Sequence, residues 1–412
     1  MREIRMEAFA MSLAVAMILW PVPTNADLVL DSGASDIEIR IGNIMPYTGP
    51  LAAFSTIGRA EAAYFDMVND NGGINGRKVK FISYDDNSNP RTAVEQTRKL
   101  IETDNVLLVF GSFGTPSNLA TRSYLNDRKI PRLFVASGDN EWANPKAFPW
   151  TMGWQPTFGA EGRIYANYIH ATYPGRKIAV LWQNDQFGRD LFRGLQAGLG
   201  DYAQMIVADT SVDLTEPSSL DAQIDILKNS DAEILILDVA PAIAARALRK
   251  IAELDWHSVN LLDSASSSIA NALRPAGLQN ASGVISTSFL KDAGDPAWRD
   301  DPSMKAWSSF MDKYFPDGDK EDSNAVFGYA AAQTLFRVLS QCGNDLSREN
   351  VMRQSASLRN FQSSVVLPGI TINTGAADFH PIKQMRLVQF DGINWQPIGD
   401  VIESAFVESL RQ

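Results

Sequence analysis

From residue 37 onward, the chain alternates short apolar runs with longer amphipathic segments. Runs such as IEIRIGNIM and NVLLVF have the length and composition of strands. The segment from about Ser55 carries apolar residues at helical spacing and predicts a helix that stops at Gly72-Gly73. Strands and helices keep alternating to about Leu262. This order indicates an α/β fold in which helices cover parallel sheets.

Two local signals support individual elements. The segment SNPRTAVEQTRKLIE predicts a helix that Asn89 caps and that carries Pro90 in its first turn. Near the end of the chain, QMRLVQFDGINWQPIGDV predicts strands and turns, with a hairpin at Asp391-Gly392. The tail therefore departs from the strand and helix alternation of the rest.

The number of expected strands indicates more than one sheet. A single sheet holding all of them would be unusually wide, whereas 412 residues are enough for two cores. The segment PWTMGWQP, residues 149–156, interrupts the alternation with aromatic residues and prolines. We therefore expect two doubly wound lobes with a crossover at this segment.

The N-terminal residues have the layout of a secretory signal peptide. Charged residues precede an apolar run from Ala8 to Trp20, which is followed by prolines and the small residue Ala26. The run is short for a bilayer span, so a retained membrane anchor is the weaker alternative. We expect residues 1–26 to be removed and residues 27–36 to form a loose leader. The exported chain then holds only Cys342, which excludes an intramolecular disulfide.

The net charge of the chain disfavours one class of binding partner. The formal net charge is -11, the sequence pI is about 4.9, and no block of basic residues occurs. Proteins that bind nucleic acids usually carry a basic patch. We therefore expect no nucleic-acid partner.

The stretch VFGSFGTPSN, residues 109–118, follows an apolar run and has the features of an anion-binding loop. Ligands of open parallel sheets lie beyond the carboxyl ends of the strands, where a helix N-terminus offers unpaired N–H groups. Thr115 and Pro116 are expected to begin such a helix, with Thr115 as its N-cap, and Ser112 and Ser117 add hydroxyl groups. The structural alternative is that Thr115 only caps the helix and the glycines only turn the chain.

Catalytic motifs are not apparent in the sequence. It contains neither a phosphate-binding GxxxxGK loop nor the G-x-S-x-G order of a hydrolase nucleophile. The three scattered histidines and one cysteine give no metal-ligand spacing. We therefore expect no enzyme, and no catalytic residue, metal or cofactor. An enzyme with an unrecognised site and a sensory module remain as alternative classes.

Several segments of the sequence resemble those of a known family. The segment from IGNIMPYTGP to GGINGRKV and YDDNSNP resembles the N-terminal signature of periplasmic substrate-binding proteins of the branched-chain amino acid, leucine-binding type. WQNDQFGRD and PRLFVASG match further positions, so the resemblance covers about residues 37–401. It implies the type I periplasmic binding fold, in which two doubly wound parallel-sheet lobes are joined by a three-crossover hinge and enclose one small ligand.

The resemblance also implies an organisation and partners. The first lobe is expected to hold residues 37–155 and a return segment, 287–362, and the second lobe residues 156–286 and 363–412. The family implies a periplasmic location, a small-molecule ligand, and the permease and ATPase subunits of an ABC transporter at the inner membrane. The alternative within this fold is a module that presents its ligand to a receptor.

The family's ligand pocket can be carried over position by position. Thr115 corresponds to the hydroxyl residue that receives the ligand carboxylate, and the other positions supply backbone groups, hydroxyls or aromatic walls. The full set of expected ligand-binding residues is Phe54, Thr115, Ala136, Ser137, Gly138, Trp154, Gln155, Phe187, Ala240 and Ser266. For the aromatic residues, a place in the core is the alternative.

Two departures from the family concern the ligand. Amino-acid binders neutralise the ligand ammonium with an acid near the crossover or after a late strand of the second lobe. Here those places hold Gln155 and the serine-rich run 264–268. Burying an ammonium group without an ionic partner costs several kcal/mol. A zwitterion is therefore disfavoured unless another acid replaces the missing one, the candidates being Asp139, Glu141, Asp238 and Asp263.

The resulting hypothesis is a carboxylic acid with an apolar or aromatic body. Thr115 and neighbouring amides would hold the carboxylate, and aromatic residues would pack against the rest. A branched-chain or related amino acid is the alternative, and a neutral amide also stays open.

Overall fold

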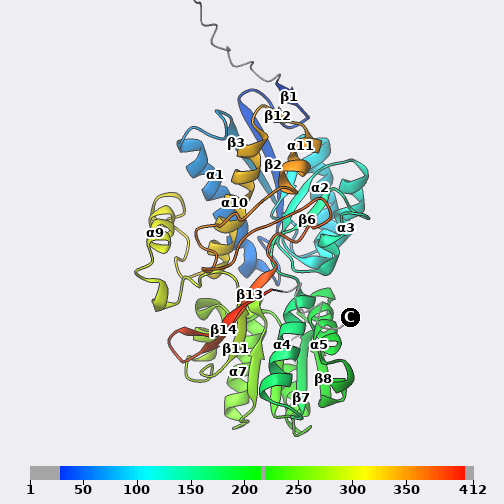
Figure 1. Cartoon of the computed structure of the whole chain (residues 1–412), viewed down its shortest axis with the longest axis vertical. Coiled ribbons are helices and arrows are strands. Elements are labelled where there is room, and N and C mark those ends of the chain that lie inside the picture. Colours follow the sequence, from blue (N-terminus) through cyan, green and yellow to red (C-terminus); the bar gives the residue numbers. More distant parts are fainter. Residues whose placement is uncertain (1–27, 215–218, 404–412) are drawn as a thin grey trace, which may run out of the picture.

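A computed structural model describes residues 28–214 and 219–403 of the chain. The expected signal peptide, residues 1–26, lies outside the described residues. Figure 1 shows two α/β lobes, one above the other, each built on its own sheet. Two lobes of this kind, joined by several crossovers, are the architecture that the family resemblance implies. Among the described helices, none combines the length and apolar character needed to cross a membrane.

The first lobe is a parallel five-stranded sheet in the order β3-β2-β4-β5-β6. Its strands are β2 (Glu38–Met45), β3 (Lys78–Asp85), β4 (Leu108–Phe110), β5 (Arg132–Val135) and β6 (Thr151–Gly153). Its first helices are α1 (Ser55–Asp70), α2 (Pro90–Glu102) and α3 (Thr115–Asp127). The predicted cap of α2 is confirmed, because the Asn89 side chain accepts a hydrogen bond from the Arg91 N–H at 2.9 Å.

The second lobe is a seven-stranded sheet in the order β14-β13-β11-β10-β9-β7-β8. The parallel strands are β7 (Ile178–Gln183), β8 (Ile206–Val212), β9 (Ile234–Asp238), β10 (Val259–Leu262) and β11 (Ile285–Ser288). The antiparallel strands β13 (Gln384–Phe390) and β14 (Trp395–Glu403) form the predicted hairpin at Asp391-Gly392.

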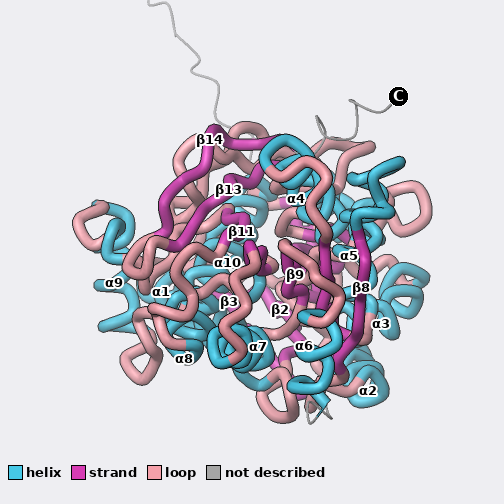
Figure 2. Tube along the Cα trace, turned by 90° about the horizontal axis from the view of Figure 1, so that it is seen from below, coloured by secondary structure: helices cyan, strands magenta, loops and turns pink. Residues whose placement is uncertain are grey.

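Helices cover both faces of this second sheet (Figure 2). α4 (Phe158–Thr172) and α5 (Gln186–Leu199) lie on one face, and α6 (Leu220–Lys228) and α7 (Pro241–Glu253) lie on the other. Side chains of β9 alternate accordingly: Ile234 and Ile236 pack in one apolar cluster, and Leu235 and Leu237 pack in the other. The continuous apolar run of β9 is thus explained by burial on both faces.

After β11 the chain returns to the first lobe. It forms α9 (Pro302–Tyr314), α10 (Ser323–Cys342) and α11 (Arg348–Ser355), which lie with the upper lobe in Figure 1. α10 packs closely on α1, since a Cβ at Gly328 would lie 2.4 Å from the carbonyl oxygen of Ile57. Because of this return segment, the chain passes between the two lobes more than once.

The prediction that residues 27–36 form a loose leader is wrong for residues 28–36, which the structure describes. β1 (Val29–Leu30) pairs in parallel with β12 (Asp345–Leu346). The Asp31 carboxylate also accepts a hydrogen bond from the backbone N–H of Arg348 at 2.7 Å. These partners lie more than three hundred residues away in the sequence, so local patterning gave no sign of them.

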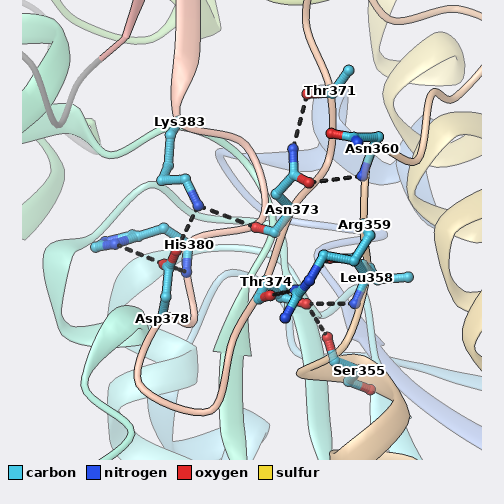
Figure 3. Close-up of polar contacts among 10 residues, drawn as sticks. All are labelled: Ser355, Leu358, Arg359, Asn360, Thr371, Asn373, Thr374, Asp378, His380 and Lys383. Carbon is cyan, nitrogen blue, oxygen red and sulfur yellow. Dashed lines mark hydrogen bonds and ion pairs between the residues drawn. The ribbon is translucent and has the colours of Figure 1, made fainter.

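The long connection from α11 to β13 is held on the first lobe by polar contacts (Figure 3). Thr374 Oγ1 donates to the carbonyl oxygen of Ser355 at 2.6 Å and accepts from the Leu358 N–H at 3.0 Å. Lys383 donates to the carbonyl oxygen of Asn373 at 3.2 Å, and the Asn373 side chain accepts from the Asn360 N–H at 2.7 Å, which links the end of the connection to its start. We therefore propose that the last crossover to the second lobe lies just before β13, rather than near residue 363.

Candidate functional site

A cleft of about 440 Å³ lies between the lobes, at the carboxyl ends of strands from both sheets. Eight of the ten expected residues line it, and two do not. Those that line it are Phe54, Thr115, Ala136, Ser137, Gln155, Phe187, Ala240 and Ser266. The volume falls in the range of about 300–1,000 Å³ that is usual for small-molecule sites.

Trp154 and Gly138 are the two expected residues that do not line the cleft. Trp154 is fully buried, and its indole N–H donates to Thr334 Oγ1 on α10 at 3.1 Å. Its position just after β6 therefore places it in the joint between the lobes. A Cβ at Gly138 would lie 2.7 Å from the carbonyl oxygen of Pro156, so this glycine packs against the crossover.

Thr115 does not cap α3 as expected. The N-cap is Gly114, at φ 87°, and Thr115 is the first helical residue. The freed hydroxyl lies 2.6 Å from Ser137 Oγ, which also accepts from the indole N–H of Trp142 at 3.0 Å. Two hydroxyl groups have two protons, and the hydrogen bond between them uses only one. The second proton is available, so this pair can donate a hydrogen bond to a ligand. The first N–H groups of α3 add further donors.

The other two hydroxyls expected in this loop serve the protein itself. Ser112 Oγ accepts from the backbone N–H of Ile44 at 3.1 Å, and Ser117 Oγ donates to Asp86 at 2.6 Å. Both side chains are buried away from the cleft. Of these three hydroxyl groups, only that of Thr115 therefore lies at the cleft.

Aromatic pairs form the apolar walls. Phe54 stacks on Phe113 with ring centroids 4.4 Å apart, and Phe187 meets Phe158 edge-on at 4.7 Å. All four rings line the cleft. Phe113 and Phe158 were missed by sequence reasoning. Phe113 stands in a glycine-rich loop, which was the available signal, whereas Phe158 is the first residue of α4.

None of the four acids considered as ammonium partners lines the cleft. Asp263 lies behind its wall, where its carboxyl oxygens accept from the N–H groups of Ser266 at 3.0 Å and Val239 at 3.2 Å. Asp238 is fully buried. Burial raises the pKa of both carboxyls well above the ordinary value, and neighbouring acids add to the effect.

Three other acids, missed by sequence reasoning, do line the cleft: Asp185, Asp292 and Asp295. Each of them holds backbone N–H groups of its own loop or of a neighbouring element. Asp185, for example, accepts from the Gly188 N–H at 3.3 Å and from the side-chain amide of Gln183 at 2.6 Å. These bonds give all three carboxyls a structural task at the cleft wall.

The cleft continues along the second lobe toward the hairpin. Trp298, at the end of a short 3-10 helix, and Trp395, at the start of β14, both line this extension and are partly buried. The backbone N–H of Trp395 donates to the Asp295 carboxylate at 3.1 Å, which ties the two sides together. The extension gives the cleft room for an elongated apolar group.

Metal chemistry finds no support in the described residues, in which no group of three or more His, Cys, Asp or Glu side chains is arranged to hold a metal ion.

Two open α/β sheets that face each other across a cleft of this size define a two-lobed solute-binding protein. The chain belongs to the periplasmic binding protein family, whose model matches residues 38–394. Among curated relatives, an amino acid binding protein of Pseudomonas aeruginosa is 23% identical over 309 residues, which cover 74% of this chain and 79% of that protein.

Solved structures show the same fold. A branched-chain amino acid ABC transporter protein from Thermus thermophilus with bound valine superposes with a TM-score of 0.81 at 16% identity, over 91% of this chain and 98% of that one. A fatty acid ABC transporter substrate-binding protein from Thermomonospora curvata superposes with a TM-score of 0.73 at 18% identity, over 92% and 96%. These neighbours share an architecture and differ in ligand.

Proposed function

We propose that this protein is the extracytoplasmic solute-binding component of an ABC importer, and that it captures a small carboxylate with an apolar or aromatic body. The family and the two-lobed fold support the transport role. The Thr115 and Ser137 hydroxyl pair, beside the first turn of α3, supports the carboxylate. The phenylalanine pairs and the tryptophan-lined extension support the apolar body.

The observation that supports a ligand without an ammonium group is the position and hydrogen bonding of the acidic residues around the cleft. The carboxyls that line it hold N–H groups of the protein, and the four other candidates do not reach it. A buried ammonium group without an ionic partner costs several kcal/mol, against about 8 kcal/mol for micromolar binding. An acid without an ammonium group avoids this cost.

A branched-chain or related amino acid is the second candidate, and one observation favours it. Asp185 lines the cleft at the start of α5, and a carboxylate that accepts two hydrogen bonds still has lone pairs for an ammonium group. The named amino-acid-binding relatives point the same way.

The mechanism follows from the two-sided cleft. Contacts from both lobes are complete only when the lobes close, so the ligand stabilises the closed form by its difference in affinity between the two forms. The closed protein then presents both lobes to the permease.

A thermal-shift screen tests this function. Mature protein is unfolded and refolded to remove any retained ligand, and leucine and phenylalanine are compared with 4-methylpentanoate and 3-phenylpropanoate. At about 100 times the dissociation constant, a ligand adds about 2.7 kcal/mol of stability. We expect the acids without an ammonium group to raise the melting temperature most. A larger shift with the amino acids, lost in Asp185→Asn, would establish the second candidate instead.

A further inference from the structure

Five of the six hydroxyl groups that line the cleft from the second lobe donate their protons within the protein. The sixth, Ser268, accepts from the Asn271 N–H at 3.3 Å and from Ser323 Oγ at 3.2 Å. Three serines that line the cleft donate to backbone carbonyl oxygens, which can only accept. The three pairs, donor first, are Ser266 and Val239 at 2.5 Å, Ser267 and Ser264 at 2.9 Å, and Ser288 and Leu290 at 2.8 Å. None of these three protons faces a ligand.

Glu161 engages two further hydroxyls of this wall. Its carboxylate on α4 accepts from Ser264 Oγ at 2.9 Å and from Thr287 Oγ1 at 2.7 Å, and both of these side chains line the cleft. The Ser264 backbone N–H, which can only donate, fixes Oε1 as an acceptor at 2.7 Å. Glu161 is itself 1% exposed and does not line the cleft, so it acts through the hydroxyls that it orients.

A hydroxyl whose proton is engaged presents only lone pairs to its other neighbours. The second lobe therefore offers the ligand hydrogen-bond acceptors, from Ser264, Ser267 and Ser288 above all, because these are partly exposed. The first lobe offers donors, from the Thr115 and Ser137 pair and the start of α3. With the exception of Ser268, the hydroxyl groups of the two walls are thus opposite in hydrogen-bonding character.

We propose that the ligand carries an uncharged hydrogen-bond donor, a hydroxyl or an amide N–H, toward the second lobe in addition to its carboxylate toward the first. Glu161 is the positioning residue that sets this preference. The proposal rests on the proposed function, since it assumes a carboxylate ligand. A 2-hydroxy acid with an aromatic or branched body has this chemistry.

Matched acids test the proposal by isothermal titration on refolded protein. The probes share one skeleton: 2-hydroxy-3-phenylpropanoate has a donor, 2-oxo-3-phenylpropanoate only an acceptor, 3-phenylpropanoate neither, and phenylalanine an ammonium group. The same series on the 4-methylpentanoate skeleton runs beside it. We expect the hydroxy acid to bind about 3- to 10-fold more tightly than the oxo and unsubstituted acids, as one neutral hydrogen bond allows.

Glu161→Gln tests the role of the carboxylate. The amide of glutamine donates through its nitrogen, so Ser264 or Thr287 must turn its own proton toward the cleft. We expect the preference to reverse, with the oxo acid binding at least as tightly as the hydroxy acid. A merely structural defect would weaken both acids alike.

Thr287→Val and Ser264→Ala serve if Glu161→Gln does not fold, and each is expected to lower the hydroxy-acid preference about 3-fold or more. Ser286→Ala is the matched control on the same strand, because the Ser286 hydroxyl donates to the Leu262 carbonyl at 2.7 Å and does not line the cleft. Its affinities should equal those of the unmodified protein.

The outcomes separate the two proposals. Binding of the acids without any preference among them, unchanged in Glu161→Gln, overturns this inference and leaves the proposed function standing. If phenylalanine or leucine binds most tightly, the proposal that the ligand's donor is uncharged is wrong. Failure of every carboxylate to bind overturns the proposed function, and the inference with it.

Discussion

The hydroxyl of Thr115 lies where the helix α3 begins, beside Ser137 in the loop that follows β5, so one substitution tests the carboxylate contact. Thr115→Val keeps the shape of the side chain and removes its hydroxyl. Hydrogen bonds to charged groups are worth about 1.5–3 kcal/mol. We expect affinity for an acid ligand to fall by about 10- to 100-fold in isothermal titration.

The control for this prediction is Thr172→Val, at the exposed last residue of α4. It makes the same chemical change far from the donors of α3 and should leave affinity unaltered. Equal affinities for the Thr115→Val variant and the unmodified protein would show that the carboxylate is held elsewhere in the cleft.

Individual residues were predictable where the local pattern carried the chemistry. Thr115 and Ser137 follow buried strands, and such positions fall at the ligand edge of a parallel sheet. Asp185 and Phe158 were missed because a cap or a helix start looks the same in sequence whether or not it faces a cleft. Trp154 was misplaced because its neighbour Thr334 is 180 residues away.

At the scale of elements, the turn between β4 and α3 depends on Gly111. Its φ is 62°, and a Cβ there would lie 2.0 Å from Glu61 Oε1, whose side chain is fully buried on α1. Gly111→Ala therefore adds a collision to an unfavourable backbone conformation. We expect it to lower the free energy of unfolding in urea by about 1–3 kcal/mol more than a glycine change without the collision.

Gly76→Ala provides that comparison, because Gly76 has φ 83° with no atom near its Cβ position. It isolates the backbone contribution from the collision. If both variants lost the same stability, Glu61 would have to relax freely, and the close approach of this loop to α1 would not restrict residue 111.

The β13 and β14 hairpin brings a second element to the cleft through Trp395. Truncating this half-buried ring removes apolar contact from the elongated part of the site. We expect Trp395→Ala to weaken 3-phenylpropanoate binding by about 1–2 kcal/mol and to leave acetate binding unchanged. Ile393→Ala, on the same hairpin but 65% exposed and outside the cleft, is the control. Equal losses in both variants would assign the effect to the hairpin's stability.

The elements themselves were largely predictable, because the spacing of apolar residues differs between buried strands and amphipathic helices. The helix from Ser55, the capped helix from Pro90 and the hairpin at Asp391-Gly392 are confirmed. The pairing of β1 with β12 was not predictable, because two-residue strands have no period to read.

At the scale of the whole molecule, buried acids gather where the lobes meet. Asp139 follows β5 of the first lobe and is 1% exposed, and Asp190 on α5 of the second lobe is 6% exposed. Burial, followed by the nearby charge of Asp139, raises the pKa of Asp190 to about 7. Burial likewise raises the pKa of Asp292 to about 6. The molecule thus holds several carboxyls that resist ionisation.

The direction of the pH dependence follows from these shifts. An acid whose pKa is higher in the folded than in the unfolded chain, where it is about 3.9, binds its proton more tightly when folded. Stability is therefore greatest at low pH for this group, falls as the pH rises above about 4, and is reduced in full above the folded pKa. Asp190 alone makes the free energy of unfolding decrease between about pH 4 and pH 7.

Asp190→Asn tests this account, because asparagine has nearly the shape of the protonated acid and can still accept from the side-chain amide of Gln186, now at 2.9 Å from Asp190. We expect urea unfolding at pH 5 and pH 8 to show a smaller loss of stability in this variant than in the unmodified protein. Asp201→Asn, an exposed acid of the second lobe, should reproduce the original loss. Equal losses in all three proteins would mean that Asp190 ionises as easily in the folded chain as in the unfolded one, and that the lobes meet without a pH-dependent repulsion at this point.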